Sequence, residues 1–136
     1  MEIIIHTNIK KFDTDYKKAF GEYAKRTSPY CKLTIKNYKT ISQISLGKSS
    51  KKLILNSGKE TISSPDLAKL IQDYNLNGFS TIEIIIPSSN EACNFNFDYD
   101  ILQLSSFNIS TELSIVVLSE QIYRAYTILN NITYHK

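Results

Sequence analysis

Five short stretches of the chain have the hydrophobic pattern of β-strands. Residues 2–7, 52–56 and 81–86 are nearly continuous apolar runs, which is typical of strands buried on both faces of a sheet. Residues 31–38 alternate instead, with Leu33 and Ile35 on one side and lysines on the other. Residues 101–105 complete the set as a further short strand.

Three stretches between these strands have helical spacing. The first follows an N-cap at Asp13 or Thr14, and its apolar positions recur three or four residues apart: Tyr16, Ala19, Phe20, Tyr23 and Ala24. The second is predicted to begin at Ser64-Pro65-Asp66, with Ser64 as the N-cap, and to end at Asn77-Gly78. Residues 112–129 are apolar nearly all round, which predicts a buried helix.

The order of these elements predicts an α/β fold. Strands that alternate with helices favour a mostly parallel sheet with helices on both faces. Residues 40–52 and 88–100 are expected to be irregular connections, the first of them mobile. Ligands of such folds bind at the carboxyl ends of the strands, which points to the loops after Leu55, Ile86 and Ser105.

The composition indicates one domain, residues 1–136, of an ordinary globular protein. Of 136 residues, 42% are hydrophobic and 21% charged, and no apolar run approaches the length of a membrane span. Two cysteines exclude a disulfide framework, and no signal peptide is visible. We therefore expect a cytoplasmic protein without membrane contacts.

The charge is distributed unevenly. Residues 1–60 hold thirteen Lys or Arg against five Asp or Glu, whereas residues 61–136 hold three against eight. Lys17, Lys18, Lys25 and Arg26 lie mostly off the apolar stripe of the first helix, which would give that helix a basic outer face. Such a face attracts polyanions such as RNA, although an acidic protein partner or a merely solvated surface has the same signature.

Two familiar chemical patterns do not apply. Gly47-Lys48-Ser49 resembles the end of a phosphate-binding loop, but Ser42 stands where that loop needs a glycine. His6 and His135 are the only histidines, and neither has cysteines or carboxylates at ligand spacing. No metal site is predicted.

The C-terminus carries the specific signal. Residues 118–126 read LSEQIYRAY and residues 130–136 read NNITYHK. This resembles the end of the large-subunit ribosomal RNA methyltransferase H family, whose chains close with LEQ-LYRA and NxPYHK or similar. Residues 55–59, 102–105 and 23–26 are similar to that family's LDxxGK loop, LSLS strand and Y-x-(K/R)-R.

The resemblance implies a homodimeric SPOUT-class fold with a C-terminal trefoil knot. It also implies an activity, the transfer of a methyl group from S-adenosylmethionine to a pseudouridine nitrogen of 23S ribosomal RNA in the large ribosomal subunit. In such enzymes the protein mainly aligns the attacking nitrogen with a methyl group that is already electrophilic.

The resemblance also assigns residues. The cofactor would be held by backbone groups of three loops, which here contain Leu55, Pro87, Ser88, Leu104, Ser105, Ile109 and Leu113. In the tail, which would reach the partner subunit's site, His135 would accept a proton or anchor the substrate, Tyr134 would position it, and Lys136 would contact phosphate. Arg124 would ion-pair within the dimer or touch RNA.

Two of the cofactor loops depart from the family pattern. Pro87-Ser88 replaces the family's Gly-Gly, and residues 110–113 read STEL where the family has PHQL. Proline lacks a backbone N–H and fixes φ, which changes what the loop offers a ligand. Three hypotheses follow: an active methyltransferase, a catalytically silent RNA-binding dimer that has lost cofactor binding, and a methyltransferase refitted to another RNA base.

Overall fold

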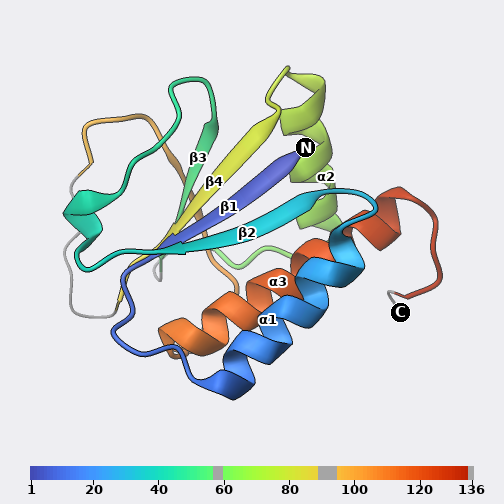
Figure 1. Cartoon of the computed structure of the whole chain (residues 1–136). Helices are drawn as coiled ribbons and strands as arrows, with labels where there is room; N and C mark the ends of the chain where they lie inside the picture. The colour runs from blue at the N-terminus through green and yellow to red at the C-terminus, as the bar shows by residue number, and fades with distance from the viewer. Residues whose placement is uncertain (57–59, 89–94, 135–136) are drawn as a thin grey trace.

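The computed structural model describes residues 1–56, 60–88 and 95–134 (Figure 1). Within these ranges the chain forms a parallel five-stranded sheet in the order β2-β1-β4-β3-β5. The strands are β1 (Glu2–Thr7), β2 (Lys32–Asn37), β3 (Lys51–Leu55), β4 (Thr81–Ile86) and β5 (Asp100–Leu102), and the α-helices are α1 (Thr14–Thr27), α2 (Ser64–Leu76) and α3 (Thr111–Leu129). The α/β class and the parallel sheet are confirmed.

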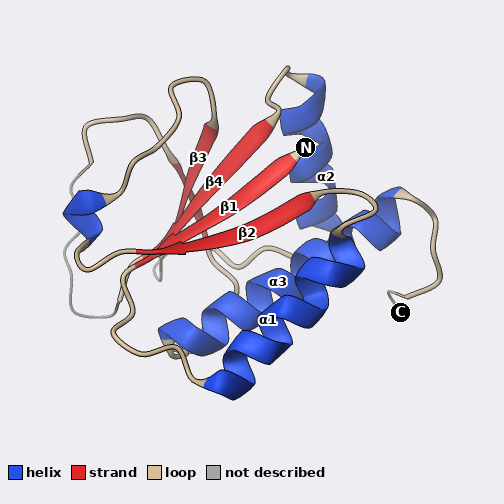
Figure 2. Ribbon diagram, in the orientation of Figure 1, coloured by secondary structure: helices blue, strands red, loops and turns tan. Residues whose placement is uncertain are grey.

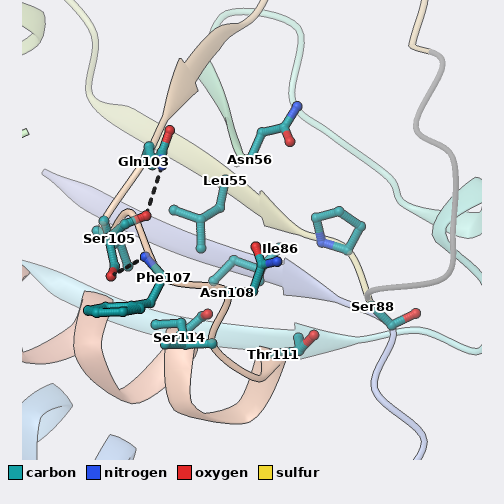
Figure 3. A pocket seen from close by; sticks show the side chains of 13 residues that line it. Leu55, Asn56, Ile86, Ser88, Gln103, Ser105, Phe107, Asn108, Thr111 and Ser114 are labelled. Atoms are coloured by element: carbon teal, nitrogen blue, oxygen red, sulfur yellow. Dashed lines mark hydrogen bonds between the residues drawn. The ribbon is translucent and has the colours of Figure 1, made fainter. Parts of the chain in front are cut away.

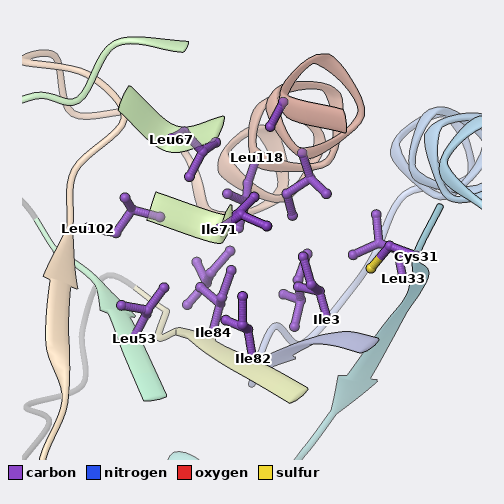
Figure 4. Packing of buried hydrophobic residues seen from close by; sticks show 14 of the residues in the cluster. Ile3, Cys31, Leu33, Leu53, Leu67, Ile71, Ile82, Ile84, Leu102 and Leu118 are labelled. Atoms are coloured by element: carbon purple, nitrogen blue, oxygen red, sulfur yellow. The ribbon is translucent and has the colours of Figure 1, made fainter. Parts of the chain in front are cut away.

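The core lies between the sheet and the α-helices. Alternate residues of neighbouring strands face the same way, and Ile3 is in register with both Leu33 and Ile82. These side chains pack against Leu67 and Ile71 of α2 and Leu118 of α3 (Figure 4). Helix α3 packs against both α1 and α2, and Ile115, Leu118 and Ile122 are fully buried. The predicted buried helix is therefore confirmed as the centre of the helical layer.

Within the described residues the three α-helices all lie on one face of the sheet, whereas the sequence pattern predicts helices on both (Figure 2). The strand order gives the reason. The steps from β1 to β2 and from β3 to β4 run in the same direction along the sheet. Right-handed crossovers in one direction carry both helices to the same face. The steps from β2 to β3 and from β4 to β5 run the other way, and their connections cover the opposite face.

The connection between β2 and β3 lies on that opposite face and is ordered there. The connection contains a short 3-10 helix, η1 (Ile41–Gln43), and Ile41 packs on Ile54 and Ile85 of the sheet. The N–H of Gly47 donates to the buried Glu83 of β4. These contacts fix the segment that its serine- and lysine-rich sequence predicts to be mobile.

Two helix starts differ from the prediction by one residue, since α3 begins at Thr111 and the cap of α2 is shifted. Ser63, not Ser64, caps α2, because its hydroxyl accepts the N–H of Asp66 at 3.2 Å. The hydroxyl of Ser64 bonds instead to Gln121 of α3. Among the described residues, no helix is long and apolar enough to cross a membrane.

Candidate functional site

A pocket of about 430 Å³ opens at the carboxyl edge of the sheet (Figure 3). It lies where β3, β4 and β5 end, which is the edge that the strand pattern predicts for a ligand site. Its volume is in the range of small-molecule sites. The lining comes from three segments of the chain: Leu55 and Asn56, then Ile86, Pro87 and Ser88, then Gln103, Leu104, Ser105, Phe107, Asn108, Ile109, Thr111 and Ser114.

Hydrogen bonds fix the wall between β5 and α3. The buried Gln103 donates through Nε2 to the carbonyl oxygen of Ser105 at 2.8 Å, and the Ser105 hydroxyl accepts the N–H of Phe107 at 3.0 Å. Ser110 then caps α3 by accepting the N–H of Leu113 at 3.2 Å. The chain therefore reaches the start of α3 in a defined path along the pocket.

The wall after β4 is joined to the end of β1. The N–H of Ser88 donates to Oδ1 of Asn8 at 2.8 Å, and Nδ2 of Asn8 donates to the Ser88 hydroxyl at 3.1 Å. Pro87 has no N–H to offer. Asn8, the residue that follows β1, therefore fixes the position of Ser88 in this wall.

The lining chemistry suits a ligand that is part polar and part apolar. Leucine, isoleucine and proline side chains provide apolar surface, while amide and hydroxyl groups of Asn56, Asn108 and Thr111 provide hydrogen bonds. S-adenosylmethionine combines an aromatic base, a ribose and a charged amino-acid end, so both kinds of surface can be used. The residues present fit that cofactor.

The structure brings together most of the residues expected to hold the cofactor. Six of them line the pocket: Leu55, Pro87, Ser88, Leu104, Ser105 and Ile109. Leu113 is not in the lining and lies 38% exposed on the first turn of α3. Asn56, Gln103, Asn108 and Thr111 are lining residues that the sequence reasoning did not name. Their place in the chain could have indicated them, because each lies at or near the end of a predicted strand or the start of a predicted helix.

The expected tail residue Tyr134 lies away from the pocket of its own chain. Its hydroxyl donates to Oε1 of Glu120 at 3.1 Å, and its ring packs edge-on against Tyr123 and beneath the Arg124 guanidinium. Burial and the Glu120 carboxylate raise the pKa of Tyr134. Since α3 rises about 1.5 Å per residue, Glu120 is roughly 13 Å along the helix from Thr111 at the pocket. His135 and Lys136 lie outside the described residues.

The expected RNA-binding residues fall into two settings. Lys17, Lys18, Lys25 and Arg26 are exposed on α1, where Arg26 pairs with Glu22 at 2.8 Å. Arg124 is largely covered on α3 and forms an ion pair with Glu120 at 2.7 Å. The basic face of α1 is thus open to a partner, while the Arg124 guanidinium is engaged within the chain.

No group of three or more potential metal ligands occurs among the residues that the structure describes. His6 is fully buried between Glu83 and Tyr38 on the face opposite the α-helices.

The fold and the pocket define the general class: an α/β protein with a pocket of small-molecule size at the carboxyl edge of a parallel sheet. Comparison with known proteins narrows this class. The family model described as a predicted SPOUT methyltransferase matches residues 1–135.

Curated relatives agree with this match. The Thermoanaerobacter sp. (strain X514) protein named ribosomal RNA large subunit methyltransferase H 1 is 35% identical over the full length of both chains. The ribosomal RNA large subunit methyltransferase H of Mycoplasmopsis synoviae is 32% identical over 94% of this chain and 95% of its own. That of Fusobacterium nucleatum is 34% identical over 85% of this chain and 75% of its own. The chain belongs to the SPOUT methyltransferase family, which confirms the resemblance of its C-terminus.

Proposed function

We propose that this protein uses S-adenosylmethionine to methylate a pseudouridine of 23S ribosomal RNA in the large ribosomal subunit. The observation that carries the proposal is the pocket. Its lining comes from the same three loops that the family resemblance assigns to the cofactor. Relatives named ribosomal RNA large subunit methyltransferase H, similar along the whole chain, support RNA of that subunit as the substrate.

The chain's own residues would hold and orient the reactants. S-adenosylmethionine supplies the methyl group, which its sulfonium makes electrophilic. The loops that contain Leu55, Pro87-Ser88 and residues 104–109 line the pocket and would hold the cofactor. His135 of the tail, outside the described residues, takes the proton that the pseudouridine nitrogen must lose. Tyr134 holds the nucleotide or the tail in place.

The tail would serve the pocket of a second copy of the chain. Tyr134 is held on α3, well outside the pocket of its own subunit. A homodimer in which each tail completes the partner's site accounts for this separation. We also propose the C-terminal knot. Its support is the loop before α2, which is joined to the segment after β5 by the bonds from Asn56 N–H to the Leu102 carbonyl and from Ile62 N–H to the Gln103 carbonyl.

The basic face of α1 would bind the RNA. Helix α1 begins just after the carboxyl end of β1, at the same edge of the sheet as the pocket (Figure 1). Lys10 and Lys11 lie exposed in the intervening loop, and Lys17 and Lys18 follow on the first turns of the helix. Phosphates bound along this face would run toward the pocket. We place the reaction in the cytoplasm, where ribosomes are assembled.

The catalytically silent alternative is less well supported. It rests on Pro87-Ser88 and the STEL sequence in place of the family motifs. Both altered loops nevertheless border a cavity of cofactor size, and the backbone of the second is fixed by the Ser110 cap. Side-chain replacement has not filled the pocket.

The proposal is tested by methyl transfer to ribosomes. The purified protein is incubated with methyl-labelled S-adenosylmethionine and large ribosomal subunits from a strain that lacks its own enzyme of this family. We expect one labelled pseudouridine in 23S RNA, mapped by mass spectrometry of RNA fragments. Label at another base would support the refitted enzyme, and no label at saturating cofactor would support the silent dimer.

A further inference from the structure

One buried residue outside the pocket is hydrogen-bonded to the pocket wall that follows β4. Asn8 follows β1 directly and is only 5% exposed. Strands β1 and β4 are parallel neighbours with Thr7 in register with Ile86, which brings their carboxyl ends together. At this junction the Asn8 side chain accepts the N–H of Ser88 at 2.8 Å and donates to its hydroxyl at 3.1 Å.

The chemistry of the two groups fixes the orientation of the amide. A backbone N–H can only donate, which places the Asn8 oxygen toward it. The Asn8 NH₂ group then faces the Ser88 hydroxyl oxygen, which accepts. Among the common side chains of this size, asparagine alone presents a neutral acceptor and donor side by side, and burial makes an unmet partner costly.

This clamp determines what the wall offers a ligand. Pro87 has no N–H, and the N–H of Ser88 is directed to Asn8. In Figure 3 the Ser88 hydroxyl points away from the other labelled side chains of the pocket. The wall therefore meets a ligand with the Pro87 ring and not with the backbone donors of these two residues.

We propose that Asn8 is a positioning residue of the pocket, which sets the place of the Pro87 wall against the bound cofactor. The proposal rests on the function proposed above. It explains how a loop with proline and serine can still border the cavity. Ser88 is held by Asn8, the residue that follows β1, and this contact fixes the adjoining Pro87 independently of a ligand.

The test is the affinity for S-adenosylmethionine, measured by calorimetry on the full-length protein. Asn8→Ala should weaken binding about tenfold, the change expected when hydrogen bonds of ordinary strength are lost. In methylation assays it should raise the KM for S-adenosylmethionine and leave the KM for ribosomes unchanged. Asn8→Asp keeps an acceptor for the Ser88 N–H, and the Ser88 hydroxyl can rotate to donate. Its affinity should stay within about threefold of the wild type.

Asn37→Ala is the matched control. Asn37 also donates from its side chain to the loop after β1, at the Ile9 carbonyl oxygen, but lies outside the pocket lining. Because Asn37 is exposed, the variant should lose less thermal stability than Asn8→Ala, and it should keep wild-type cofactor affinity. Asn8→Ala with wild-type affinity would overturn the proposal. If Asn8→Ala does not fold, Asn8→Asp decides: an affinity within about threefold of the wild type supports the proposal, and a larger loss overturns it. A wild-type protein that binds no cofactor would instead overturn the proposed function.

Discussion

The most constrained single residues lie on the face of the sheet opposite the α-helices. Glu83 is 3% exposed and accepts hydrogen bonds from His6 Nε2 at 3.0 Å, from the Gly47 N–H at 2.9 Å and from the Ser50 hydroxyl. Because an ionised carboxylate only accepts, neutral His6 carries its proton on Nε2 and its Nδ1 accepts from the Tyr38 hydroxyl at 3.0 Å. This cluster attaches the connection between β2 and β3 to the sheet.

Glu83→Ala should therefore destabilise the fold. Removing the carboxylate leaves the fully buried His6 and the N–H of Gly47 without their partner, which costs about 3 kcal/mol in the free energy of unfolding. The measurement is urea denaturation followed by circular dichroism. As a control, Glu22→Ala breaks only the exposed pair with Arg26 and should change stability little. Equal changes in the free energy of unfolding for the two variants would show that the Glu83 cluster does not stabilise the fold.

The same cluster predicts how stability depends on pH. Burial lowers the pKa of His6, against the hydrogen bond and charge of Glu83. Burial alone would raise the pKa of Glu83, but hydrogen bonds from Ser50, Gly47 and His6 bring it below its ordinary value. Both groups bind protons more readily in the unfolded chain. The stability they contribute is thus present at neutral pH, declines below about 6.5 as His6 titrates, and declines further below about 4.5 through Glu83.

Thermal melting between pH 8 and pH 4 measures this decline. The His6→Gln variant cannot titrate and should lack the part of the decline that begins near pH 6.5. A variant and a wild type whose melting temperatures fall in parallel would contradict the assignment to His6.

Sequence reasoning missed most of this residue-scale detail. His6 could be read only as a histidine without metal partners, because its partners Tyr38 and Glu83 are distant in sequence. Glu83 interrupts a run of isoleucines, and a carboxylate in a buried strand is a signal for a paired charge. Asn8 gave no such signal, since its role depends on the register between β1 and β4.

At the scale of elements, helix α1 should determine RNA affinity. Reversing Lys17, Lys18 and Lys25 to Glu removes exposed cations that would neutralise phosphates. We expect weaker binding to large ribosomal subunits and a flatter dependence on salt, because fewer counterions are released. The measurement is a filter-binding titration at several salt concentrations.

A triple reversal elsewhere provides the control for total charge. Lys39, Lys48 and Lys69 are exposed lysines outside α1, and their reversal makes the same change in net charge. It should reduce affinity less than the α1 variant does. Equal losses would show that net charge, and not this helix, attracts the ribosome.

Element type was predictable because hydrophobic spacing is a local property. The five strands and three α-helices of the described residues occur where the spacing predicts them, and β5 alone is much shorter than expected, whereas the 3-10 helix η1 lies in a segment predicted to be irregular. Which face of the sheet each helix or loop covers was not predictable from hydrophobic spacing. It depends on strand order, and the sequence of residues 81–86 does not indicate that β4 lies between β1 and β3. Ile41, Ile44 and Leu46 are scattered in a serine- and lysine-rich segment, and their role is evident only from their packing against Ile54 and Ile85.

At the scale of the whole molecule, the separation of pocket and tail predicts sites shared between two subunits. A chain that lacks residues 134–136 should fold, because the Tyr134 contacts lie on the outer surface of α3, and should be inactive. Asn108→Trp, which places a large ring in the pocket lining, should be inactive for a different reason.

Mixing the two inactive proteins, with gentle denaturation to exchange subunits, should restore methylation. The mixed dimer joins an intact pocket from one subunit to an intact tail from the other. Each variant incubated with itself is the control. A mixture that stays inactive, although exchange is verified by mass spectrometry, would contradict a tail that serves the partner's pocket.

The central claim is that the pocket at the carboxyl edge still binds cofactor despite Pro87-Ser88 and the altered residues before α3. Calorimetric titration of the purified protein with S-adenosylmethionine, and with its demethylated product, tests this claim most directly. We expect saturable heat with a micromolar dissociation constant for both ligands. No detectable heat at millimolar ligand would contradict the account and leave a family member that binds RNA without the chemistry.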